Sequence, residues 1–263
     1  MPEPVLQLLP PSIEALRHGN TGVDFVHEWR GLQPGPEVLV QALTHGNEVC
    51  GAWAALWLYE QIAAGWTQRC GRLTLALANV DAFASFDPAA PHRSRCVDED
   101  LNRVWSDAEL DGPRDSLELR RARVLRPFVD RAELLLDIHS MSEPCAPLMV
   151  CGTVDKNAHY ARELGVPAYL LIDTGHPAGL RMVERGGFGD PASAKRTLLV
   201  ECGHHWESSS RDVAIDTLMR FLTLTGLADA DWAAQHTRLP RPPRQRLVRV
   251  TEAVVARSID FHF

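Results

Sequence analysis

Apolar residues recur along the chain as short continuous runs, separated by longer stretches in which apolar and polar positions mix. Three of the runs, Val38–Leu43, Leu73–Val80 and Leu134–Ile138, have the near-continuous apolar character of strands buried on both faces. Shorter runs predict further strands over residues 24–29, 147–151, 168–172 and 196–200. The mixed stretches predict helices over residues 49–64, 116–133, 155–164 and 211–224.

Strands and helices alternate in this pattern, which indicates an α/β protein with a mostly parallel mixed sheet flanked by helices on both faces. Residues 24–29 are expected at a sheet edge, closed by Gly31 and by a turn at Pro34-Gly35-Pro36. Asp115 is the expected cap of the helix over 116–133. Residues 81–114 have no clear period, and irregular stretches of this length in a folded domain usually carry function.

The C-terminal part has a different composition. Residues 238–246 are rich in proline and arginine and are typical of a linker, whereas residues 247–256 alternate like one strand. We therefore divide the chain into a catalytic domain over 1–228 and a linker with a terminal strand over 229–263. That strand either joins the main sheet or begins a further β-domain.

Composition narrows the class of protein. The 263 residues carry a net charge of -7 and contain no run of basic residues, so neither nucleic acid nor a membrane surface is an expected partner. No apolar stretch is long enough to span a membrane, and the first residues do not resemble a secretory signal. The six cysteines contain no C-x-x-C pair, which is typical of reduced thiols in a cytoplasmic protein.

The candidate chemistry begins directly after the first buried strand, at His45-Gly46-Asn47-Glu48. An imidazole and a carboxylate three residues apart can bind the same Zn²⁺ ion, and Gly46 allows the chain to turn sharply between them. Taken alone, this pair is more often a surface histidine beside a glutamate at a helix start.

Two further strands end in residues of the same kind, at His139 and at Glu201. The carboxyl ends of parallel strands meet at one crevice, so these side chains are expected close to His45 and Glu48. Two histidines and one glutamate around zinc leave a fourth position open for water, which is a catalytic arrangement. Glu201 is then a spare carboxylate suited to move a proton, and one Zn²⁺ per protomer is expected.

Several other residues fit such a site. Asn102 and Arg103 can hold a substrate carboxylate, and Arg95 is a second cation in the same loop. Asp137 lies on the same strand face as His139 and can orient its imidazole. Arg181 follows His176 in a glycine-rich loop and is a candidate to hold a second carboxylate. His204 and His205 are more simply interpreted as pocket lining or a hydrogen-bonding pair.

Four motifs, H-G-N-E at 45–48, D-L-N-R at 100–103, D-I-H-S at 137–140 and V-E-C-G at 200–203, occur in this order. In order and spacing they resemble the succinylglutamate desuccinylase/aspartoacylase family, a branch of the zinc carboxypeptidase-like fold, over roughly residues 38–225. The resemblance implies that His45, Glu48 and His139 bind zinc and that Glu201 is the catalytic carboxylate. It also implies that Asn102 and Arg103 bind the substrate carboxylate and that Arg95 polarises the scissile carbonyl.

This resemblance implies a zinc-dependent amide hydrolase that acts on a small N-acyl amino acid. The residues after His139, Ser-Met-Ser-Glu-Pro, differ from the aspartoacylase pattern, so acetylaspartate is not the expected substrate. The family usually continues into a C-terminal β-domain near the active site. A carboxypeptidase that acts on short peptides and a metal-binding protein without catalysis are the alternatives. The sequence leaves open the acyl group, the amino acid, the metal and the oligomeric state.

Overall fold

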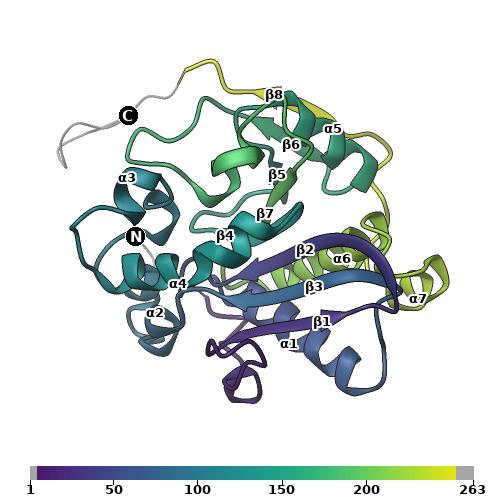
Figure 1. The fold of residues 1–263 in the computed structure, drawn as a ribbon, viewed down its shortest axis with the longest axis horizontal. Coiled ribbons are helices and arrows are strands. Elements are labelled where there is room, and N and C mark those ends of the chain that lie inside the picture. Colours follow the sequence, from purple (N-terminus) through teal and green to yellow (C-terminus); the bar gives the residue numbers. More distant parts are fainter. Residues whose placement is uncertain (1–4, 253–263) are drawn as a thin grey trace.

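The computed structural model describes residues 5–252 and is built around one eight-stranded sheet, with the order β1-β3-β2-β4-β7-β5-β6-β8 (Figure 1). The strands are β1 (Val26–Arg30), β2 (Gln33–Ala42), β3 (Cys70–Leu77), β4 (Leu134–Met141), β5 (Leu148–Val150), β6 (Tyr169–Ile172), β7 (Arg196–His204) and β8 (Arg246–Arg249). Only the β1–β3 and β5–β7 pairs are antiparallel. The predicted mostly parallel mixed sheet is confirmed, with β1 at one edge.

Helices cover both faces of this sheet, with α4 on one side and α1 and α6 on the other (Figure 1). The longer helices are α1 (Val49–Ala63), α4 (Leu117–Arg131), α5 (Asp155–Leu164) and α6 (Ser208–Leu224), and the shorter ones are α2 (Val80–Ala84), α3 (Asp107–Leu110) and α7 (Ala230–His236). No helix of the described residues is both long and apolar enough to cross a membrane.

Side chains of the central strands alternate between the two faces of the sheet, which explains why these strands are continuous apolar runs in the sequence. Val38 and Val40 of β2 pack into the core beneath α1, α5 and α6, whereas Leu39 between them packs into the core beneath α4. Leu135 and Leu136 of β4 divide between the two cores in the same way. Because both faces of the sheet are buried, almost every position of these strands is apolar.

The predicted turn at Pro34-Gly35-Pro36 is wrong, because these residues lie inside β2. The pairing of β2 with β3 shifts register between Gln33 and Glu37, and such an irregularity accommodates prolines that cannot donate to the ladder. The predicted cap of α4 is also wrong. Ser116 accepts the hydrogen bond from the backbone N–H of Leu119, whereas Asp115 forms an ion pair with Arg120.

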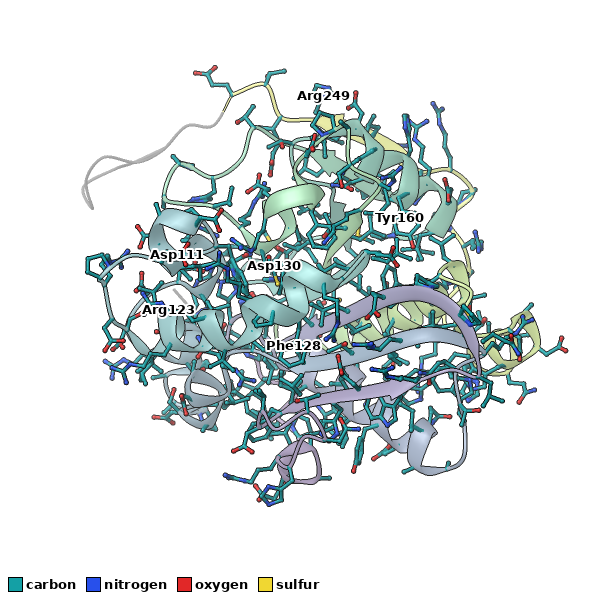
Figure 2. The ribbon with its side chains drawn as sticks, in the orientation of Figure 1. Asp111, Arg123, Phe128, Asp130, Tyr160 and Arg249 are labelled. Carbon is teal, nitrogen blue, oxygen red and sulfur yellow. The ribbon has the colours of Figure 1, made fainter. Side chains whose placement is uncertain are left out.

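The C-terminal strand β8 pairs in parallel with β6, with Leu170 opposite Leu247. Arg249 of β8 lies beside α5 (Figure 2), and its Nη2 is 2.8 Å from Asp155 Oδ1. Residues 247–249 of the expected strand therefore join the main sheet, residues 250–252 are not in a strand, and residues 253–256 of that prediction lie outside the described residues. Helix α7, which lies within the stretch 229–263 expected to hold only a linker and a strand, was not predicted.

Candidate metal centre and active site

The turn between β2 and α1 places His45 and Glu48 at the carboxyl edge of the sheet. Leu43 adopts a left-handed backbone conformation (φ 58°) and redirects the chain as it leaves β2. The backbone N–H of Gly46 donates to Arg95 O at 3.1 Å. A side chain at this glycine is excluded, because a Cβ would lie 2.3 Å from Phe83 N and 2.4 Å from Ser94 O. The turn is thus pressed against the loop that follows β3.

His139 and Glu201 lie directly opposite each other on the paired strands β4 and β7. Both strands continue a few residues beyond the predicted ends, so the two residues lie inside the strands near their carboxyl ends. This parallel register brings residues 62 positions apart in sequence onto neighbouring positions of the sheet, beside the β2–α1 turn (201 − 139 = 62).

His45, Glu48 and His139 form a buried cluster whose ligand atoms lie within 4.8 Å of one another. His45 Nδ1 is 2.7 Å from Glu48 Oε1, and His139 Nδ1 is 2.9 Å from Glu48 Oε2. The three residues are only 1–3 % exposed. Two imidazole nitrogens and a carboxylate that converge at one point could hold a metal ion.

A second carboxylate lies close to the other nitrogen of each imidazole. His45 Nε2 lies 2.9 Å from Asp100 Oδ1, and His139 Nε2 lies 2.7 Å from Asp137 Oδ2. Thr44 donates to the remaining Asp137 oxygen at 2.9 Å. Carboxylates behind metal-binding histidines fix the tautomer in which the inner nitrogen is free to bind a cation.

The electrostatics of the cluster also fit a cation. Burial lowers the pKa of His139, but the charges of Asp137 and Glu48 outweigh burial and raise its pKa well above the usual value. Burial raises the pKa of Glu48, yet the neighbouring charges of His139 and His45 bring it well below the usual range. Both shifts favour positive charge beside the carboxylates of this cluster. The donor set therefore fits a divalent metal ion.

Glu201 faces the same cavity but is not part of the ligand cluster. Burial raises the pKa of its carboxyl to about 8, against the charge of His139, which lowers it. Glu201 Oε2 is buried and has no hydrogen-bond partner among the described residues. A carboxylate with a raised pKa and a free oxygen beside a metal-binding cluster is suited to exchange protons.

A cavity of about 260 Å³ lies over the cluster. Its lining includes all eight site residues expected from the sequence: His45, Glu48, Arg95, Asn102, Arg103, His139, Arg181 and Glu201. The structure thus brings these residues together around one cavity.

The loop residues take distinct positions in this cavity. Arg95 Nη2 lies 2.9 Å from both His45 Nε2 and Asp100 Oδ2. Asn102 uses its side-chain oxygen to accept from Met182 N at 3.1 Å, which leaves its amide nitrogen without a partner among the described residues. Arg103 Nη1 donates to its neighbour's backbone oxygen, Asn102 O, at 2.7 Å, and the rest of its guanidinium has only a distant contact to Asp100 at 3.7 Å.

Arg181 lines the cavity but already has close acidic partners. Its guanidinium is held by Asp173, with two contacts of 2.7 Å, and by Glu184, with contacts of 2.8 and 3.0 Å. Arg181 is only 8 % exposed. A guanidinium bound on two edges by internal carboxylates has little capacity left for a second substrate carboxylate.

Sequence reasoning missed one polar pair at this site. Ser140, which lines the cavity, has its Oγ 2.7 Å from His205 Nδ1. Burial lowers the pKa of His205 to about 4, so this imidazole is neutral. Its Nε2 is buried without a partner among the described residues, and an unpaired N–H there would cost more than an unpaired lone pair. The favoured tautomer carries its proton on Nδ1 and donates to Ser140, whose hydroxyl hydrogen then points elsewhere.

The fold and the site define a class of protein, and comparison with known proteins identifies the family. The fold and site are those of an α/β protein with a metal-competent crevice at the carboxyl edge of its sheet. The model of the succinylglutamate desuccinylase/aspartoacylase catalytic domain matches residues 34–219. The chain belongs to this family. No curated protein sequence matches the chain.

Solved structures share the fold. The succinylglutamate desuccinylase of Vibrio parahaemolyticus is 17 % identical with a TM-score of 0.65, over 90 % of this chain and 70 % of that one. The succinylglutamate desuccinylase of Chromobacterium violaceum is 20 % identical with a TM-score of 0.60, over 87 % and 74 % of the two chains. A succinylglutamate desuccinylase/aspartoacylase of Rhodobacter sphaeroides is 18 % identical with a TM-score of 0.62, over 87 % and 66 %.

Proposed function

We propose that this protein is a zinc-dependent hydrolase that cleaves the amide bond of an N-acyl amino acid. This proposal rests on the buried His45–Glu48–His139 cluster. A fourth residue, Glu201, has a carboxylate oxygen without a partner among the described residues and lies in the same cavity. A binding protein needs no spare carboxylate with a raised pKa beside the metal, whereas hydrolysis does. Membership in a family named for deacylases supports the same reaction class.

His45, Glu48 and His139 would hold one Zn²⁺ through two imidazole nitrogens and a carboxylate. When bound, zinc would supply Lewis acidity toward the scissile carbonyl and make water a stronger nucleophile. Asp100 and Asp137 would keep the two imidazoles in the orientation seen here. Glu201 would accept a proton from the attacking water and deliver it to the leaving amine.

The cations of the cavity would bind the substrate. Arg103 is the arginine of the lining whose guanidinium has the weakest internal contacts, so it would take the substrate carboxylate, with help from the free amide nitrogen of Asn102. Arg95, partly exposed and close to His45, would place positive charge near the carbonyl oxygen as it becomes negative. A cavity of about 260 Å³ suits a small molecule of this kind.

We place this activity in the cytoplasm, because all six cysteines are free in the structure, as expected of a reducing compartment. The proposed partner is a small N-acyl amino acid.

Burial raises the pKa of Cys151 to about 12, so this thiol is a poor metal ligand, and Cys151 is outside the cluster.

A hydrolysis screen tests the proposal. Zinc-loaded protein is offered N-acetyl, N-formyl and N-succinyl amino acids together with dipeptides and blocked dipeptides, and released amine is measured. We expect turnover of N-acyl amino acids that is abolished by a chelator and restored by zinc. Preferential cleavage of dipeptides would favour the carboxypeptidase alternative. Tight zinc binding without turnover of any compound would favour the non-catalytic metal-binding alternative.

A further inference from the structure

A second cavity adjoins the catalytic one and has a different charge. This open groove of about 590 Å³ shares His176 with the catalytic cavity. The rest of its lining is mostly glycine and threonine, and its charged residues are Glu184 and Asp190. The groove lining therefore holds two carboxylates and no lysine or arginine, whereas the catalytic cavity is lined by three arginines.

The boundary between the two cavities is the ion cluster of Asp173, Arg181 and Glu184. Arg181 lines the catalytic cavity and Glu184 lines the groove. Each carboxylate binds a different edge of the guanidinium, and four contacts of 2.7–3.0 Å join the three side chains. With two carboxylates and one guanidinium, the cluster has a formal charge of −1 (+1 − 2 = −1). The arginine at this boundary thus presents no net positive charge to a ligand.

The three arginines of the catalytic cavity differ in how closely carboxylates pair with them. Arg95 is paired with Asp100 at 2.9 Å, and Arg181 is neutralised by its two carboxylates. Arg103, whose nearest carboxylate contact is 3.7 Å, is the one of the three without a close acidic partner among the described residues. One available guanidinium matches one substrate carboxylate. A second carboxylate would meet the acidic boundary and the acidic groove, and like charges at such a site disfavour binding.

We propose that the substrate carries a single carboxylate, bound by Arg103, and that its remaining side chain is neutral and polar or positively charged and extends past His176 into the groove. This inference rests on the deacylase activity proposed above and names its substrate class. Asp173 and Glu184 act as specificity-determining residues, because they occupy the arginine that would otherwise accept a second carboxylate. Asp190 is the exposed carboxylate of the groove and would face the end of a cationic side chain.

The test compares substrates that differ in side-chain charge, with glutamate and glutamine matched in size. The values of kcat/KM are measured for N-acetylglutamate, N-acetylglutamine and N-acetyllysine with zinc-loaded protein. We expect N-acetylglutamine and N-acetyllysine to exceed N-acetylglutamate by about tenfold or more, the range of one charge-assisted contact. An equal or higher value for N-acetylglutamate would overturn the inference while leaving the deacylase proposal intact.

Two variants test the residues themselves. Asp173→Asn removes one negative charge from the boundary and is expected to move the glutamine-to-glutamate ratio about tenfold toward glutamate. Asp190→Asn keeps the oxygen that accepts from Ala192 N at 2.9 Å, so the fold is expected to be retained. This second variant should lower kcat/KM for N-acetyllysine several-fold and should lower kcat/KM for N-acetylglutamine by a smaller factor. Unchanged selectivity in both variants would overturn the assignment.

Binding separates the two proposals. Calorimetry of the same three compounds with the zinc-loaded Glu201→Gln variant reports affinity without turnover. The same order of affinities is expected even if none of the compounds is hydrolysed. Absence of hydrolysis would overturn the deacylase proposal, whereas the order of affinities alone decides the preference for a single carboxylate.

Discussion

His139 Nε2 lies 2.7 Å from Asp137 Oδ2, so a buried carboxylate two residues away on the same strand lies directly behind the imidazole. The pair leaves Nδ1 of His139 directed at Glu48, on the side where a metal would bind. Asp137 would act on a metal only by orienting His139. A change at Asp137 therefore tests this orientation while all three proposed ligands stay in place.

Asp137→Asn is therefore expected to weaken zinc binding by roughly 10- to 100-fold, because an amide cannot stabilise the required tautomer as a carboxylate does. Competition with a chromogenic chelator measures the dissociation constant. Asp115→Asn, at an exposed carboxylate near the start of α4, is the matched control and should bind zinc like the parent protein. Unchanged affinity in Asp137→Asn would mean that the pair is structural only.

Glu201→Gln keeps the size of the side chain and removes its basicity. We expect kcat to fall by roughly two orders of magnitude or more, with zinc content unchanged, because Glu201 would move the proton during attack and departure. Glu163→Gln, at an exposed glutamate of α5, serves as the control. Loss of zinc from Glu201→Gln would instead identify Glu201 as a ligand.

Arg103→Ala should raise KM by about 10- to 100-fold for substrates with a free carboxylate, since a charge-assisted contact of about 1.5–3 kcal/mol is lost. The effect should vanish for the corresponding methyl ester, which the parent protein should already bind poorly. Arg93→Ala, at an exposed arginine of the same loop, should change neither value. Equal turnover of acid and ester by the parent protein would contradict the role of Arg103.

The pH dependence of stability follows from the raised pKa of Glu201. The folded, metal-free protein holds this proton up to a pH of about 8, whereas the unfolded chain releases it near 4.5. The free energy of unfolding should therefore fall as the pH rises through this interval. His139, whose pKa is also raised, contributes in the same direction above its unfolded value of 6.5.

Urea unfolding in the presence of a chelator at pH 6, 7 and 8 measures this decline. The Glu201→Gln variant should show a shallower decline than the parent protein, because one titrating group is gone. Zinc affinity should show the opposite trend and rise with pH, since the metal must displace protons from His45 and His139. A flat stability profile in the parent protein would argue against a protonated site.

Ser140→Ala removes a hydroxyl that His205 holds in the cavity at 2.7 Å. We expect a several-fold increase in KM with kcat and zinc content nearly unchanged, because the free hydroxyl hydrogen is available to a substrate oxygen. Ser140→Thr retains the hydroxyl and should stay within about twofold of the parent protein. The same increase in KM in both variants would assign the effect to packing.

The meeting of these residues could be predicted from the sequence because His45, His139 and Glu201 each come at the end of a recognisable apolar run. Parallel strands bring their carboxyl ends together, so chain order alone predicted the meeting of these residues. The loop residues were harder to place. Glu118 of α4 is fully buried and accepts hydrogen bonds from Val97 N, Asp98 N, Glu99 N and Asn79 Nδ2, and these contacts set the course of the loop.

The sequence contained no local signal for such long-range contacts. The position of Asp100 beside His45 depends on the course of this loop. The ion pair that occupies Arg181 depends on Asp173, eight residues away across a glycine-rich turn. The pair of Ser140 and His205 crosses from β4 to the end of β7. In each case the partner is chosen by tertiary structure, whereas residue type and spacing predicted only that a polar group would be present.

Gly46 joins two parts of the site that are remote in sequence. Its N–H binds Arg95 O, and its missing side chain lets the backbone of residues 82–83 and 94 lie against the turn that carries His45. The loop that carries Arg95 and the turn that carries His45 are thereby held together before any ligand binds, so the entropy of ordering them against each other is lost during folding and not at each encounter with a ligand. Even a methyl group at this position would push the two segments apart, so a change at a residue outside the proposed ligand set would alter the proposed metal site and the proposed substrate site together.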